Sequence, residues 1–177
     1  MAPTDSIASW LGQPDRASVA YVRGAPGTGK SILATRTLLD VPGSLYLAFD
    51  EPGGRVFRRM ELSHKRFGGT PFEVREVSSL AQFRAEAFEW TTGVVCVDSL
   101  AAFKPAEVSR ILRGHRMYGR RALLATDGVR GALASMEISQ QADIVVLVRD
   151  SIAFELKNRF EVGAPRVCPI NLGGDHG

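Results

Sequence analysis

The chain has 177 residues, 45% of them hydrophobic, with a formal net charge of +3 and a pI near 9.1. This length suits one domain with a buried core, and the balanced composition excludes a largely disordered chain. No window reaches the ~18 apolar residues of a spanning helix, and the N-terminus lacks the charged-then-apolar pattern of a signal peptide.

We therefore expect a cytoplasmic protein with a single domain over residues 1–177, in which residues 1–17 form an N-terminal segment and residues 173–177 a frayed tail. Cys96 and Cys168 lie in apolar stretches far apart, which predicts buried core residues and no disulfide framework. The three histidines are scattered along the sequence, so we expect no zinc site.

Apolar runs typical of strands alternate with helical patterns, and this alternation predicts a mainly parallel sheet flanked by helices. Strands are expected at 18–24, 44–50, 93–100, 121–126, 142–151 and 152–160, and helices at 31–40, 55–67, 79–90 and 106–119. The segment 72–77 is short and exposed in character, and 131–141 is either helix or loop. The segments from 142 onward, with 166–174, have no helix between them, so we expect antiparallel strands at the end of the sheet.

A glycine-rich loop, called the P-loop below, follows the first predicted strand and precedes the first predicted helix. Its residues are Gly24, Ala25, Pro26, Gly27, Thr28, Gly29, Lys30 and Ser31, which match the G-x-x-x-x-G-K-[ST] pattern in full. The glycines let backbone N–H groups turn toward phosphate oxygens, and the helix adds its N-terminal partial charge. Lys30 is expected to reach the β- and γ-phosphates and Ser31 to ligate Mg²⁺. The loop therefore predicts binding of a nucleoside triphosphate.

The strand "GVVCVDS" ends in Asp98. A carboxylate at the carboxyl end of a buried parallel strand lies where such sheets bind ligands. We expect Asp98 to hold Mg²⁺ through its water shell or to bond Ser31; the alternative is a cap of the following helix.

Asp50 and Glu51 end the strand that follows the P-loop helix, a strand expected to neighbour the P-loop strand. A carboxylate there can orient and deprotonate the attacking water, with Glu51 favoured over Asp50. Asp-Glu-Pro-Gly is also good turn chemistry, which is the alternative.

The order of the P-loop, "LYLAFDEP", "VVCVDSL" and "LKNRFEVG" resembles the RecA-like core of the RadA/Sms, KaiC and DnaB group. The segment "LKNRF" matches four of the five positions of the K-N-R-F-G signature of RadA-type proteins, with Glu161 in place of the glycine. The resemblance implies an ATPase that uses ATP and Mg²⁺ and assembles with itself, as a hexameric ring or a filament. It also implies that Lys157 and Arg159 reach the γ-phosphate of a neighbouring subunit as catalytic residues; the alternative is an ordinary solvent-facing strand end.

Arginine outnumbers lysine 18 to 4, a bias that either favours phosphate contacts or follows from GC-rich coding. The candidate nucleic-acid contacts are Lys104, Arg110, Arg113 and Arg130. Arg130 lies in the loop "TDGVRGALAS", which corresponds to a channel loop in RecA-like rings, and Lys104 lies in the loop after Asp98. Arg110, Arg113 and Arg116 share a helix face, although such a stripe also suits a solvated surface.

Three function classes stay open, beside a minimal core without activity of its own that a partner subunit completes. The first is an oligomeric RecA-like ATPase that acts on DNA, single-stranded DNA being favoured, in recombination, repair or replication. The second is a KaiC-like regulatory ATPase whose output is a nucleotide-dependent protein contact. The third is a small-molecule kinase. The sequence argues against it, because no arginine-rich lid over the phosphates is evident.

Overall fold

The computed structural model describes residues 6–11, 17–49, 51–100, 103–126, 132–161 and 163–171. Asp50, Arg130 and the expected tail at 173–177 lie outside these ranges, as do parts of the N-terminal segment. The described part of the chain holds one sheet of eight strands in the order β3-β2-β4-β5-β1-β6-β7-β8. The strands are β1 (Val19–Arg23), β2 (Leu45–Ala48), β3 (Glu73–Glu76), β4 (Val95–Asp98), β5 (Leu123–Thr126), β6 (Ile144–Arg149), β7 (Ile152–Asn158) and β8 (Val167–Pro169).

The pairings confirm the predicted sheet. All neighbours from β3 to β6 pair in parallel, whereas β7 and β8 pair antiparallel. Between β6 and β7 stand only Asp150 and Ser151, both with positive φ. A connection of two residues can join only antiparallel strands, since a parallel pair needs a crossover of a dozen residues or more.

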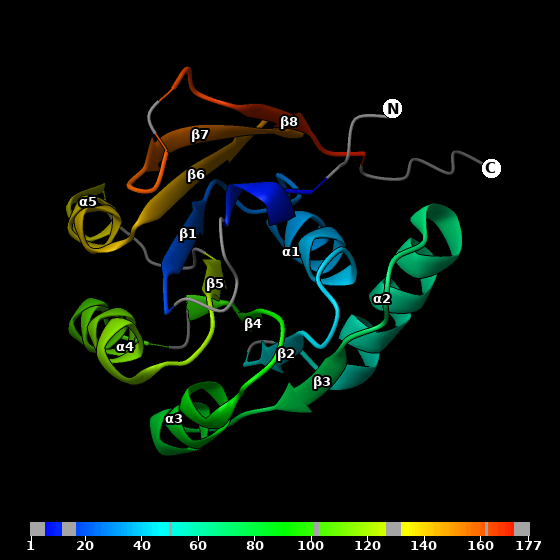
Figure 1. Cartoon of the computed structure of the whole chain (residues 1–177). Helices are drawn as coiled ribbons and strands as arrows, with labels where there is room; N and C mark the ends of the chain where they lie inside the picture. Colours follow the sequence, from blue (N-terminus) through cyan, green and yellow to red (C-terminus); the bar gives the residue numbers. More distant parts are fainter. Residues whose placement is uncertain are drawn as a thin grey trace.

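Five α-helices and a short 3₁₀ helix (η1, Ala8–Trp10) accompany the sheet in the described part of the chain. The α-helices are α1 (Lys30–Leu39), α2 (Gly53–Phe67), α3 (Leu80–Glu89), α4 (Pro105–Tyr118) and α5 (Ala132–Gln141). Figure 1 shows α1 and α2 on one face of the sheet and α3, α4 and α5 on the other. The segment 131–141, open between helix and loop from the sequence, is therefore mostly helical.

Each face of the sheet has its own hydrophobic core, because both faces of a parallel sheet are covered. On one side Leu33 and Leu38 of α1 and Val56 of α2 pack on the strands. On the other side Phe83 of α3 and Ile111 of α4 do the same. Both predicted core cysteines are buried, and they form no disulfide in the described part of the chain.

One strand position differs from the sequence expectation. The strand that ends before Asp50 and Glu51 is β2, and it does not neighbour the P-loop strand β1, because β4 and β5 lie between them. Strand order depends on contacts between distant segments, which local sequence patterns do not encode. The consequence is that Glu51 approaches Asp98 of β4, which pairs with Ala48 of β2.

His115 is a buried ionisable group in α4 that the site does not use. Its Nε2 lies 2.6 Å from the carbonyl oxygen of Arg121, so this ring nitrogen carries the hydrogen and donates. Burial lowers the pKa of His115, and the bond to Arg121 opposes this only in part.

We therefore expect the protein to lose stability as the pH falls below about 6.5, the ordinary pKa of an unfolded histidine. In that range the unfolded chain binds a proton that the folded chain resists, so the free energy of unfolding decreases with falling pH. Thermal unfolding of the wild type and of His115→Gln at pH 7.5 and pH 5.5 measures the effect. The wild type should lose more stability than the variant, and an equal loss would contradict this assignment.

Candidate nucleotide-binding and hydrolysis site

The P-loop joins β1 to α1 and has the shape of a phosphate cradle. Gly27 and Gly29 have φ values of 77° and 101°, in the region that favours glycine. A Cβ on Gly24 would lie 2.4 Å from the carbonyl oxygen of Val148, so only glycine fits beside β6. A hollow of about 260 Å³ opens at the start of α1, lined by Gly27, Gly29, Lys30, Ser31 and Ile32.

Lys30 lies folded over this loop. Its Nζ donates to the carbonyl oxygens of Gly24 and Ala25, at 2.7 and 2.8 Å. The ammonium group therefore stays at the mouth of the cradle, where phosphate oxygens are stronger acceptors than the two carbonyls. The residues predicted to bind the nucleotide are brought together by one turn and one helix N-terminus.

Asp98 ends β4 at the same edge of the sheet, buried with a side-chain exposure of 7%. The hydroxyl of Tyr46 donates to its Oδ2 and the hydroxyl of Thr126 to its Oδ1. Burial raises the pKa of Tyr46, and the charge of Asp98 raises it further, so the phenol stays protonated as a donor. Asp98 is held in place by neighbouring strands and does not act as a helix cap, since Lys104 precedes α4.

Glu51 follows β2 and is linked to Asp98 by Arg59, an arginine that was not predicted from the sequence. Arg59 of α2 donates from Nη2 to Oε1 of Glu51 at 2.6 Å and from Nη1 to Oε2 at 3.2 Å. The same Nη2 donates to the hydroxyl of Tyr46 at 2.8 Å and lies 4.0 Å from Oδ2 of Asp98.

Arg59 also links this acidic group to the P-loop helix. Its Nε donates to Oγ1 of Thr35 at 3.0 Å, and Thr35 donates in turn to the carbonyl oxygen of Ser31 at 2.8 Å. Burial alone would lower the pKa of Arg59, but its bonds to Glu51 and the charges of Glu51 and Asp98 raise it. A signal was present in the sequence, because Arg59 stands on the buried face of α2 beside Val56 and Met60.

The residues present fit a magnesium nucleotide. The cradle has room at the helix N-terminus, and Asp98 and Ser31 would supply oxygen ligands of the kind that Mg²⁺ prefers. Glu51 also lines a hollow of about 540 Å³ at the carboxyl ends of β2 and β3, so it is reachable from outside. Among the described residues, no group of three or more His, Cys, Asp or Glu side chains is arranged to hold a metal by itself.

Lys157 and Arg159 lie away from this chain's own P-loop. Asn158, between them, stands opposite Ile144 at the start of β6, and the backbone N–H of Arg159 donates to the carbonyl oxygen of Asp143. The P-loop instead lies beside Val148, at the far end of β6. Arg159, at Asp143, is five residues along the chain from Val148, and Lys157, which pairs with Val145, is three residues from it. These separations correspond to about 16 Å and about 10 Å.

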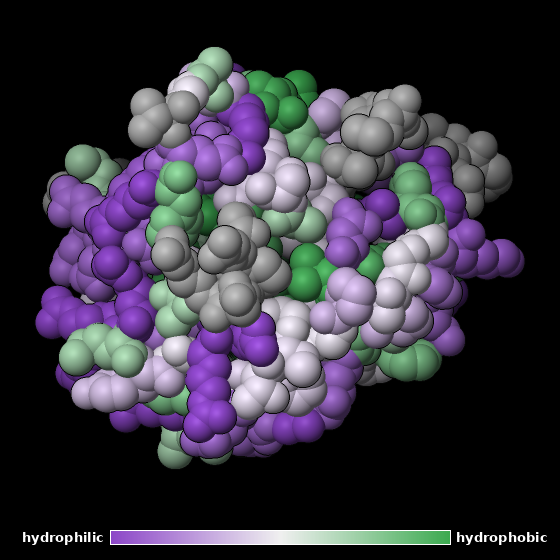
Figure 2. Space-filling model, in the orientation of Figure 1, coloured by the Kyte–Doolittle hydropathy of each residue, from purple (hydrophilic) through white to green (hydrophobic). Residues whose placement is uncertain are grey.

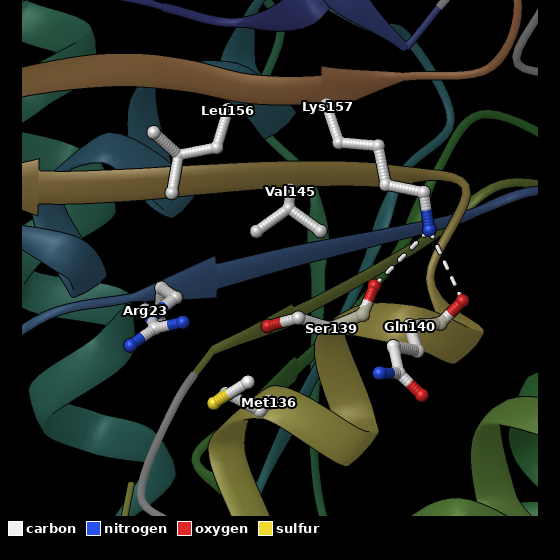
Figure 3. A pocket seen from close by; sticks show the side chains of 7 residues that line it. All are labelled: Arg23, Met136, Ser139, Gln140, Val145, Leu156 and Lys157. Carbon is white, nitrogen blue, oxygen red and sulfur yellow. Dashed lines mark hydrogen bonds between the residues drawn. The ribbon is translucent and has the colours of Figure 1, made fainter.

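Both side chains make contacts at the C-terminal end of α5. Lys157 Nζ donates to the carbonyl oxygens of Ser139, Gln140 and Ala142, at 3.1, 3.1 and 2.6 Å; Figure 3 shows the first two of these bonds. Arg159 pairs with the buried carboxylate of Asp143 at 3.3 Å. Desolvation against α5 and the charge of Arg159 lower the pKa of Lys157.

A hollow of about 370 Å³ lies beside Lys157 (Figure 3). Its lining residues are Arg23, Met136, Ser139, Gln140, Val145, Leu156 and Lys157. The hollow lies between α5 and the strands β1, β6 and β7.

The predicted nucleic-acid residues are spread over α4 and its start. Lys104 precedes α4, and its backbone N–H donates to Glu107 at 2.8 Å. Arg110 and Arg113 are exposed on α4, but Arg116 of the same stripe pairs with Asp143 at 3.3 Å. Arg130 lies outside the described residues.

No protein-family model matches this sequence, and no curated protein matches it. Solved structures do. FlaH, a flagellar accessory protein from Methanocaldococcus jannaschii, has a TM-score of 0.58 and 12% identity over 94% of this chain and 91% of its own. The RadB recombinase has a TM-score of 0.60 and 16% identity over 97% and 96%.

A protein from Pyrococcus horikoshii OT3 has a TM-score of 0.60 and 9% identity over 86% of this chain and 92% of its own. At these identities the likeness establishes the fold, which is the RecA-like P-loop fold predicted from the sequence.

No helix in the described ranges is long and apolar enough to cross a membrane.

Proposed function

We propose that this protein is a Mg²⁺-dependent ATPase of the RecA-like class that acts on DNA in recombination, repair or replication. The observation that carries the proposal is the polar network that joins Ser31 of the P-loop helix, through Thr35 and Arg59, to Glu51 and Asp98. A protein that only bound nucleotide would not need a reachable carboxylate that is linked in this way to the P-loop helix.

Each residue has a role in this proposal. Lys30 and the backbone N–H groups of the loop hold the β- and γ-phosphates, and Ser31 and Asp98 hold the metal. Mg²⁺ supplies neutralisation of the charge that develops on the phosphate oxygens. Glu51 orients the attacking water and accepts its proton, for which it must exchange at least one of its bonds to Arg59.

The active site is completed between two copies of the chain. Lys157 and Arg159 lie about 10 Å and about 16 Å along the strands from their own P-loop, and both side chains point to the end of α5, so a role at the γ-phosphate is assigned to a neighbouring copy. There they stabilise the negative charge of the transition state. To reach that phosphate, Lys157 must give up its contacts with α5 and Arg159 its contact with Asp143. Hydrolysis would therefore depend on the assembly of two copies.

The alternative is a regulatory ATPase whose output is a protein contact. The likeness to FlaH, a flagellar accessory protein, favours it as much as the likeness to RadB favours the DNA role. The two differ in their response to nucleic acid.

Steady-state ATP hydrolysis at low salt, with and without a single-stranded oligonucleotide, separates them. We expect the oligonucleotide to increase the rate, and the increase to fade between 50 and 200 mM salt as counterions compete for the phosphates. A rate that DNA does not change would exclude the DNA role and favour the regulatory one. Absence of hydrolysis in any condition would overturn both.

A further inference from the structure

The outer face of α2 carries a strong positive charge that the proposed chemistry does not use. The helix carries five arginine and lysine residues and one glutamate, whereas the whole chain has a net charge of only +3. Arg59 points inward to Glu51, as described above. The other four cations are exposed: Arg55, Arg58, Lys65 and Arg66.

These four side chains form one stripe. They stand at positions i, i+3, i+10 and i+11, and Leu62 at i+7 completes the row. Residues three and four apart on a helix are neighbours at about 5–6 Å, so the stripe runs straight along three turns. None of the four forms an ion pair within the described part of the chain, although Arg59, Arg75, Arg116, Arg149, Arg159 and Arg166 all do.

A fifth cation lies at the C-terminal end of the stripe. The guanidinium of Arg36, from α1, is 4.2 Å from the ring centre of Phe67, and that of Arg66 is 5.1 Å from the same ring. Arg36 is only 6% exposed, and its Nε and Nη1 have no hydrogen-bond partner in the described structure. Leaving these two N–H groups buried without a partner is costly, and the contact with the Phe67 ring offsets part of that cost.

Exposed apolar side chains accompany the charges. Phe57 is 50% and Leu62 61% exposed, and Figure 2 shows hydrophilic and hydrophobic surface side by side where α2 lies. Leu62 offers a base an apolar surface among the charges, whereas Phe57, two residues from Arg55, lies outside the stripe. They supply too little apolar area for a helix that inserts into a membrane surface.

We infer that the outer face of α2 binds the phosphate backbone of nucleic acid, single strands above all. Arginine suits this ligand because its planar fork makes paired bonds to phosphate. The inference rests on the proposed function for its choice of nucleic acid over an anionic membrane. It places the contacts on the opposite face of the sheet from α4, where the sequence predicted them.

The surface also lies close to the catalytic residues. Glu51 comes two residues before α2 begins, and Arg59 contacts it from within the helix. A nucleic-acid strand bound on the outer face of α2 would therefore contact the same helix that contacts Glu51 through Arg59.

Binding of a labelled single-stranded oligonucleotide, measured by fluorescence anisotropy without ATP, tests the inference. Arg58→Glu/Lys65→Glu reverses two charges of the stripe, and Arg110→Glu/Arg113→Glu is a matched control that reverses two exposed charges on α4. Since all four side chains are exposed, both variants should fold, and thermal unfolding verifies this. Arg58→Gln/Lys65→Gln is the milder second variant if charge reversal disturbs α2.

We expect the α2 variant to lose at least tenfold in affinity at 50 mM salt and the α4 variant to stay within about twofold. Loss of two phosphate contacts should also reduce the slope of log K against log salt by about 1.4 in magnitude. Equal losses in the two variants would mean that net charge alone governs binding, and this would overturn the inference. So would a wild type that binds phosphatidylserine vesicles but no oligonucleotide.

DNA-free ATP hydrolysis separates this inference from the proposed function. The α2 variant should hydrolyse ATP as the wild type does, because Arg58 and Lys65 do not touch the nucleotide site. If only the α4 variant loses affinity for the oligonucleotide while hydrolysis is normal, the ATPase proposal holds and the α2 surface is wrong. If hydrolysis is absent while α2 binds DNA, the ATPase proposal fails and the α2 surface stands.

Discussion

Replacing Lys30 with alanine is expected to weaken ATP binding by at least roughly 30-fold. Removing one partner of a desolvated charge pair costs about 2–5 kcal/mol, and each 1.4 kcal/mol is a factor of ten in affinity. The ammonium already lies at the mouth of the cradle, bonded to the carbonyl oxygens of Gly24 and Ala25, so the wild type needs little rearrangement to bind phosphate.

Titration with a fluorescent ATP analogue in Mg²⁺ measures this loss. Lys65→Ala is the matched control, because Lys65 is exposed on α2 and away from the cradle. Its affinity should stay within about twofold of the wild type. If Lys30→Ala bound the analogue as tightly as the control, the loop would not be the nucleotide site.

Replacing Arg59 with alanine is expected to lower the free energy of unfolding by about 3 kcal/mol. The change leaves the partly buried carboxylate of Glu51 without its ion pair, and it removes donors from Tyr46 and Thr35. For a chain of this size the loss corresponds to a fall in Tm of about 6–12 °C.

Arg55→Ala is the matched control for this prediction. Arg55 stands one turn earlier on the same helix, is exposed and forms no ion pair with a described residue, so its removal should change stability by less than about 0.5 kcal/mol. Arg59→Lys keeps the charge but loses the planar fork, and its stability should lie between the wild type and Arg59→Ala. Equal Tm values for Arg59→Ala and Arg55→Ala would contradict the ion-pair network.

The P-loop and the fold class were predictable because their signals are local. Eight consecutive residues specify the cradle, and the alternation of strand and helix patterns specifies the layers. The antiparallel end of the sheet was predictable for the same reason, since two residues between β6 and β7 leave no room for a crossover.

The network around Glu51 was not predictable at the same level. Tyr46, Asp98 and Thr126 come from three strands whose order is a property of the whole chain. Arg59 gave a weak signal as a charged residue on an apolar helix face, but the helix pattern did not identify Glu51 as its partner. The contacts of Lys157 and Arg159 with α5 and Asp143 likewise depend on packing between distant segments.

The most direct test of the central claim is the steady-state release of phosphate from ATP in Mg²⁺, with Lys30→Ala as the blank. The account predicts measurable turnover by the wild type and none above background in the variant. Phosphate release that is equal in the two proteins, or a wild type that binds ATP without turning it over, would contradict the claim that this chain is an ATPase.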